Sequence, residues 1–132
     1  MTRIETLRSL QTRLREATGP DSELDKDIST ALNHYDDSLV PWGGDLHPYD
    51  YTTDPDGLGA CVALMRSVLP RWLFDIRQQH QDDFQARVYR RCLKRTPHDD
   101  VFASHRLATH ATLLAIVSAL IAIEEAKEKA DV

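Results

Sequence analysis

Histidines and aspartates gather near residue 100, where His98, Asp99 and Asp100 are followed by His105 and His110. These residue types ligate zinc or transfer protons when their side chains converge. If residues 105 and 110 lie on one helix, they are about 140° apart around its axis, so they cannot share a metal as residues four apart do. The spacing therefore favours polar loop residues at 99 and 100, and a surface histidine at 105 near the start of a helix.

A second set of candidates occupies the segments HYDD (34–37) and HPYD (47–50), which contain two histidines and three carboxylates. Such a set would suit a hydrolase that uses general acid–base catalysis. The chain has no nucleophile elbow, and Gly43-Gly44 lacks the lysine and hydroxyl residue of a phosphate-binding loop. We therefore expect a solvated loop in which Trp42 packs onto the core, and a protein without enzymatic activity, metal or cofactor.

A pair of alternating segments offers the strongest candidate for a binding surface. Trp72–Arg77 and Phe84–Arg91 show the period of two residues that is typical of half-buried strands. One face of each segment is apolar, and the other is mainly charged. Arginines gather on the charged face with Leu73 and Tyr89 among them: Arg71, Arg77, Arg87 and Arg91.

Two interpretations of this arginine-rich face remain open. Arginine interleaved with aromatic residues suits phosphate or an acidic partner. Alternatively, the arginines form ion pairs with acidic helices, for instance through Glu5, Glu16, Glu23 or Asp27. Because arginine and aromatic side chains dominate binding hot spots, six residues form the candidate interface: Arg77, Arg87, Tyr89, Arg91, Trp42 and Tyr49.

The length of the chain favours one domain over residues 1–132. The net charge of −5 argues against a protein that coats nucleic acid. The charge is uneven: residues 71–95 hold seven basic and three acidic side chains (+4), which leaves −9 elsewhere. The two cysteines, Cys61 and Cys92, have no metal-type spacing and favour a reducing cytoplasmic compartment. The N-terminus lacks a secretion-signal core, and the apolar run Leu113–Ile123 is too short to span a bilayer, so we expect a soluble protein without membrane contact.

Helical spacing in the first 33 residues predicts a hairpin of two helices. The first ends near Ala17, where Gly19 and Pro20 follow, and the second begins at Asp21 or Ser22. Asp25 stands three residues after Ser22, as in a carboxylate variant of the capping box. The apolar positions are Ile4, Leu7, Leu10 and Leu14 in the first helix and Leu24, Ile28, Ala31 and Leu32 in the second.

The sequence of residues 34–53 predicts an irregular loop with a possible edge strand over Leu46–Thr52. The sequence of residues 54–129 predicts an α-β-β-α core. In this core, Asp54 caps a helix that runs to Leu69, and a last helix spans Ser104–Lys129. The last helix has two apolar stripes. It therefore either lies under both the sheet and the hairpin or offers one face to a second copy in a homodimer. The predicted fold is α+β with a small antiparallel sheet of two or three strands.

Three stretches resemble the small prophage-encoded proteins that carry the phage ABA-sandwich domain. They are LRSLQTRLREATGPDSELDKDISTAL (7–32), YDYTTDPDGLGACVALMRSVLPRW (49–72) and ATHATLLAIVSALIAI (108–123). The resemblance implies an α/β/α layered sandwich but no established activity. Two departures are Thr109-His110, where the group has a threonine-proline pair, and the missing glycine before the tryptophan-bearing strand.

The leading hypothesis for function is a phage-encoded, non-enzymatic accessory protein in the host cytoplasm that binds and modulates a host or phage protein complex. A specialised form is an anti-CRISPR-like inhibitor of a host defence nuclease. A second hypothesis is nucleic-acid binding by the arginines, which predicts salt-sensitive affinity. A third is an enzyme that uses the histidine and aspartate loops.

Overall fold

The computed structural model describes residues 2–35, 48–54, 56–91 and 99–130. Within these ranges the chain forms four helices and a three-stranded sheet, so the predicted α+β class is confirmed. The elements follow in the order α1 (Arg3–Glu16), α2 (Ser22–Leu32), α3 (Leu58–Val68), β1 (Leu73–His80), β2 (Asp83–Tyr89), β3 (Asp100–His105) and α4 (Ala108–Ala130).

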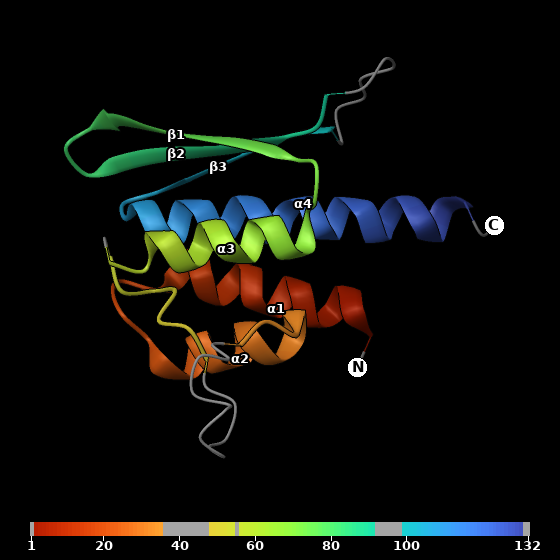
Figure 1. The fold of residues 1–132 in the computed structure, drawn as a ribbon, viewed down its shortest axis with the longest axis horizontal. Coiled ribbons are helices and arrows are strands. Elements are labelled where there is room, and N and C mark those ends of the chain that lie inside the picture. Colours follow the sequence, from red (N-terminus) through yellow and green to blue (C-terminus); the bar gives the residue numbers. More distant parts are fainter. Residues whose placement is uncertain (1, 36–47, 55, 92–98, 131–132) are drawn as a thin grey trace.

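The elements stack in three layers (Figure 1). The sheet forms one outer layer, α3 and α4 lie in the middle, and α1 with α2 forms the other outer layer. The α/β/α order implied by the resemblance would instead place the sheet between helices. The difference has a physical reason, since one face of the strands is rich in charged and polar side chains that are costly to bury under a helix.

The sheet is antiparallel with the order β1-β2-β3. The predicted strand pair is confirmed, with Phe74 opposite Val88 and Ile76 opposite Ala86. The third strand is not at Leu46–Thr52, because the described part of that segment, 48–52, forms no strand. It is at Asp100–His105, where Ala103 faces Ala86.

Tyr51 and Thr52 explain why the predicted edge strand does not form. Both residues are fully buried against α2 rather than at the sheet. The backbone N–H of Thr52 donates to Oδ1 of Asp25 over 2.9 Å, and the Tyr51 hydroxyl lies 3.4 Å from Oγ of Ser29. These bonds hold the segment on the helical hairpin.

The N-terminal hairpin agrees with its sequence signals. Thr2 and Glu5 form a capping box at α1, and the side chain of Asp21 accepts the backbone N–H of Leu24 at α2. The residue that begins α2 as its N-cap is therefore Asp21 and not Ser22. Asp25 has no capping role at Ser22, since its carboxylate is buried and bonds the backbone of Thr52 instead.

Helix α3 begins at Leu58, four residues later than predicted. Asp54 does not cap it, since its Oδ1 accepts the backbone N–H of Thr109 in the first turn of α4 at 3.0 Å. Gly57 precedes α3 at a point where a side chain would collide with the backbone carbonyl oxygens of Asp50 and Tyr51. The close approach at Gly57 packs this loop against the start of α3.

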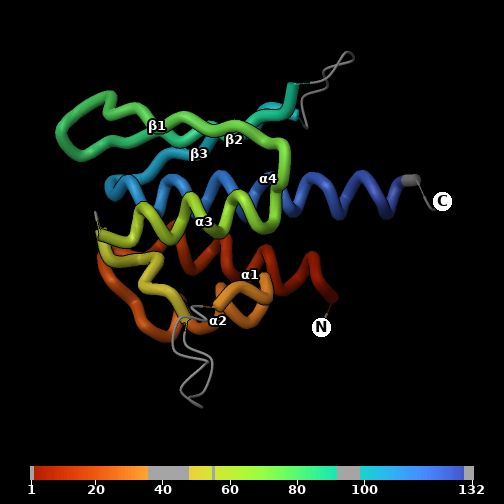
Figure 2. The backbone as a smooth tube through the Cα atoms, viewed as in Figure 1, coloured from red at the N-terminus to blue at the C-terminus, as the bar shows by residue number. Residues whose placement is uncertain are grey.

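Helix α4 is the core helix of the fold. It runs antiparallel to α1 (Figure 2), and ion pairs join the start of α1 to the end of α4, Arg3–Glu124 at 3.3 Å and Arg8–Glu125 at 2.8 Å. Its opposite side packs on β2 and β3. The two apolar stripes therefore lie under the sheet and on the hairpin, which is the first of the two predicted alternatives. The helix begins at Ala108 rather than Ser104, because residues 100–105 belong to β3.

By length and composition, the helical stretch Ala108–Lys129 is long and apolar enough to cross a membrane. The sequence prediction had considered only the shorter apolar run Leu113–Ile123. In the fold, 72% of the apolar window of the longer stretch is buried inside the protein. This burial is typical of a core helix.

Candidate functional site

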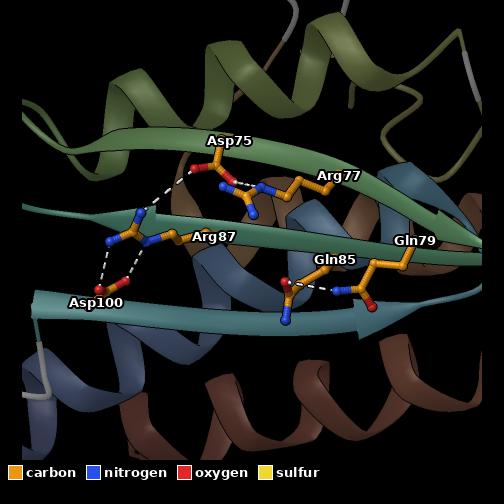
Figure 3. Close-up of polar contacts among 6 residues, drawn as sticks. All are labelled: Asp75, Arg77, Gln79, Gln85, Arg87 and Asp100. Atoms are coloured by element: carbon orange, nitrogen blue, oxygen red, sulfur yellow. Dashed lines mark hydrogen bonds and ion pairs between the residues drawn. The ribbon is translucent and has the colours of Figure 1, made fainter.

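The candidate site is the face of the sheet that points away from the helices, which we call the outer face (Figure 3). The register brings three rows of side chains together there, because directly opposite residues share a face. These residues are Leu73, Asp75 and Arg77 of β1, Gln85, Arg87 and Tyr89 of β2, and Asp100, Phe102 and Ser104 of β3. Gln79 stands at the register shift of β1, and its hydrogen bond to Gln85 places it on the same face. The opposite face, with Ala86 and Val88, is buried on α4.

Arg87 stands at the centre of the outer face. Its guanidinium donates two parallel hydrogen bonds to Asp100, of 2.7 and 2.8 Å, and lies 3.8 Å from a carboxylate oxygen of Asp75. It also lies 4.3 Å from the ring centroid of Tyr89 and 5.4 Å from that of Phe102. The hydrogen bonds to Asp100 raise the pKa of Arg87. Arg87 is therefore held in one orientation, and its guanidinium is already hydrogen-bonded to Asp100 within the sheet.

The charges of the outer face are balanced. Arg77 lies 3.9 Å from Asp75 on the same strand, and Gln79 donates to Gln85 across the hairpin at 3.3 Å. Two arginines thus face two aspartates, Asp75 and Asp100, so the described side chains of the three strands give this face no excess positive charge. This balance does not suit a phosphate backbone, which requires several uncompensated cations.

Two large apolar side chains are exposed among the described residues, and both lie on the outer face. Phe102 is 53% exposed and Leu73 is 40% exposed. They come from the two edge strands, with the Arg87–Tyr89 pair between them. The outer face thus combines exposed apolar groups with a fixed, neutral polar centre.

The six predicted interface residues do not all meet there. Arg77, Arg87 and Tyr89 lie on the outer face as predicted, and Arg91 is exposed just beyond the end of β2. Tyr49 lies away from the sheet, where its ring stacks on His34 at 4.7 Å. Trp42 lies outside the described residues.

The predicted ion pairs between these arginines and the N-terminal helices are not those observed. Arg77 and Arg87 pair with aspartates of the sheet, and the four described helices all lie on its other side. The sequence did not indicate Asp100 and Phe102 as site residues, since it predicts a polar loop at Asp100 and no strand that would include Phe102. The signal in this segment is a short apolar run, Val101–Ala103, which does not by itself distinguish a strand from the entrance to a helix.

An ion pair between Arg90 and Asp99 lies beside this face. Asp99 is 2% exposed, and its Oδ1 accepts hydrogen bonds from Nε and from a terminal nitrogen of Arg90, whose guanidinium lies 5.5 Å from the Trp72 ring. Asp99 is therefore a buried structural partner and not the polar loop residue that the sequence predicted.

The histidines form a second, internal cluster where α4 begins. The rings of His105 and His110 stack at 4.8 Å, although their spacing had predicted separate positions, because residue 105 belongs to β3 and only residue 110 to the helix. Nε2 of His105 donates to the carbonyl oxygen of Ala17 at 3.1 Å, and its Nδ1 accepts the N–H of Leu107. Burial lowers the pKa of both histidines.

A third polar cluster surrounds Tyr51. Its hydroxyl lies 2.6 Å from Nδ1 of His34 and donates to the His34 carbonyl oxygen, and burial raises its pKa. Cys61 is fully buried, with its Sγ 3.5 Å from the Tyr51 carbonyl oxygen, and burial raises the pKa of this thiol as well. Both groups are thus kept protonated and shielded, as structural groups are.

Among the described residues, no three histidine, cysteine or acidic side chains converge as a metal site would require. His98 and the loop residues 36–47 lie outside the described residues, so the predictions about them are not tested. Comparison of the chain with protein-family models, with curated proteins and with solved structures found no match. The resemblance to phage ABA-sandwich proteins stays a prediction.

Proposed function

We propose that this chain is a non-enzymatic accessory protein that binds a partner protein through the outer face of its sheet. The observation that carries this proposal is the exposure of Phe102 and Leu73 on either side of a fixed Arg87–Tyr89 pair. Exposed aromatic and arginine side chains that already have one conformation lose little entropy on binding, which favours their use as contact residues.

The chemistry of the face supports a protein partner over a nucleic acid. Arg87, its central cation, already donates two hydrogen bonds to Asp100. A nucleic acid would have to displace this carboxylate, whereas a partner protein can cover the apolar groups and leave the pair intact. In line with the sequence resemblance, we propose that the partner belongs to a host or phage protein complex.

The test is capture of partners from a bacterial lysate by the tagged protein, with and without nuclease treatment. Phe102→Ser is compared with Lys26→Ser, a matched control on the exposed surface of α2, at the opposite side of the stack. We expect a nuclease-resistant partner that the control retains and the Phe102 variant loses, while both variants keep the thermal stability of the natural chain.

Two results would contradict the proposal. Equal capture by the Phe102 and Lys26 variants would show that the outer face is not the contact. Retention that disappears with nuclease would favour the nucleic-acid hypothesis instead.

A further inference from the structure

Strand β1 is an edge of the sheet, since the order of strands is β1-β2-β3. Within the described part of the chain, only β2 pairs with it. It is the longest of the three strands, at eight residues, and its last four residues are exposed. Its pairing with β2 is regular from Leu73 to Gln78, before a register shift between Gln78 and His80, and along this regular stretch the free edge presents backbone N–H and C=O groups that readily accept a further strand.

We propose that β1 pairs antiparallel with β1 of a second copy of this chain, about a two-fold axis at Ile76, to form a continuous six-stranded sheet. This inference does not depend on the proposed function, because the contact runs along the backbone edge of β1 and its charged pairs, Asp75 and Arg77, and not through the exposed Phe102 of β3.

The side-chain pattern selects this register. A two-fold axis perpendicular to the sheet leaves the outer faces of both copies on the same side. Outward residues of one β1 must then lie opposite outward residues of the other, so the axis must pass through a residue position and not between two residues. A slip by one residue would place outward side chains opposite inward ones. Centred on Ile76, the pairing places Asp75 opposite Arg77 of the second copy, and Arg77 opposite Asp75. Centred on Asp75 or on Arg77, it would place two like charges opposite each other, which is unfavourable.

Asp75 and Arg77 are available for this exchange. Their present ion pair within the strand is 3.9 Å long, and Asp75 lies 3.8 Å from Arg87, so both contacts are near the outer limit for ion pairs. The Arg77 side chain is 72% exposed. A partner directly opposite on a neighbouring strand offers an oppositely charged group at equal or shorter range.

The other edge, β3, lacks this complementarity. Its charged residue on the outer face, Asp100, already accepts two hydrogen bonds from Arg87. The remaining outward residues of β3 are Phe102 and Ser104, so two β3 strands have no pair of opposite charges to bring together. The charges therefore assign the second copy to β1.

The test measures oligomeric state by sedimentation equilibrium over a wide range of protein concentrations. The natural chain is expected to approach the mass of two 15.0 kDa chains as its concentration rises. Asp75→Arg places two arginines opposite each other at both symmetric positions, which should raise the dissociation constant about tenfold. The double variant Asp75→Arg, Arg77→Asp restores two opposite-charge pairs and should restore the dimer.

Matched variants separate the interface from effects on the fold. Asp82→Arg makes the same change of charge in the exposed turn between β1 and β2 and should leave the dimer unchanged. If Asp75→Arg impairs folding, Arg77→Asp alters a more exposed side chain and places two carboxylates opposite each other with the same expected weakening. Circular dichroism and thermal unfolding report on the fold of each variant.

Three results would overturn the inference: a natural chain that stays monomeric at its highest soluble concentration, single variants that associate as tightly as the natural chain, or a double variant that does not recover the dimer. The outcome is distinct from that of the proposed function. A monomer that still captures its partner through Phe102 refutes the dimer alone, and a dimer that captures nothing refutes the proposed function alone.

Discussion

Lowering the pH from 7.5 to 5.5 should destabilise this protein through His110. The side chain is fully buried, and its Nε2 has no hydrogen-bond partner among the described residues. Its Nδ1 lies 3.1 Å from Oγ1 of Thr109, and its ring stacks on His105. A positive charge at this position would have little solvation, so the folded state favours the neutral imidazole.

The sign and size of the effect follow from proton linkage. Burial is the main cause that lowers the pKa of His110 below 6.5, and the neighbouring His105 lowers it further, while the nearby backbone of Gly19 and the carboxylates of Asp54 and Asp21 act in the opposite direction. Below pH 6.5 the unfolded chain therefore binds more protons than the folded chain, and the free energy of unfolding decreases as the pH falls. Between pH 7.5 and 5.5 one such histidine contributes a loss of at most about 1.4 kcal/mol, the limit reached when it stays neutral in the folded state throughout.

Urea denaturation at the two pH values measures this loss. His110→Gln removes the titrating group, and His80→Gln, at the exposed end of β1, is the matched control. We expect the control to keep the full pH-dependent decrease in stability, and we expect this decrease to be smaller in the His110 variant by up to about 1.4 kcal/mol. A smaller decrease remains in the variant, because burial also lowers the pKa of His34 and His105.

Two results would refute this reasoning. One is an equal pH-dependent decrease in the natural chain and the His110 variant. The other is an NMR titration in which the His110 ring takes up its proton near pH 6.5 or above. Asp25 does not produce the same effect, because burial raises its pKa in the folded state above 3.8. Its contribution to the stability of the fold is therefore largest at low pH and is lost as the pH rises through the folded-state pKa.

Two further predictions concern buried side chains. Leu113→Ala removes a fully buried side chain from α4 and should lower the free energy of unfolding by about 2 to 5 kcal/mol, as measured by urea denaturation; a loss below 1 kcal/mol would contradict the assigned core. Asp25→Ala leaves the backbone N–H of Thr52 without its acceptor and should cost about 1 to 3 kcal/mol by the same assay, and a neutral result would show that water or another group replaces the carboxylate.

Much of the fold could be predicted because local patterns and tertiary packing agree. The alternation in Trp72–Arg77 and Phe84–Arg91 predicted two paired strands, and the spacing of Ile4, Leu7 and Leu14 predicted the first helix. In each case the apolar face that the pattern defines is the face that packs on the core.

Strand β3 could not be found in the same way. Its six residues include Asp100, Ser104 and His105, which are typical of a loop or of the start of a helix, and an apolar helix follows two residues later. What makes this segment a strand is its pairing with β2, a contact of sequence-distant residues. The tertiary partner, and not local preference, decides such a short and polar strand.

The candidate site was predicted in part for the same reason. The position of Arg77, Arg87 and Tyr89 on one face follows from the strand period alone. The state of Arg87 does not, because the residues that hold it, Asp100 and Phe102, come from β3. Without β3 the face looks like a positive patch, and with it the face is neutral and partly apolar.

The two apolar sides of α4 explain why the outer face is left uncovered. One side of this helix is filled by α1, and the other by the inner faces of β2 and β3. Because α1 and α2 lie beyond α4, they cannot also reach the far side of the sheet. Of the helices in the described ranges, none is therefore available for the outer face, and Phe102 and Leu73 remain exposed. In the proposed function these two groups are covered by a partner protein, so the packing that explains α4 also leaves the proposed contact surface open.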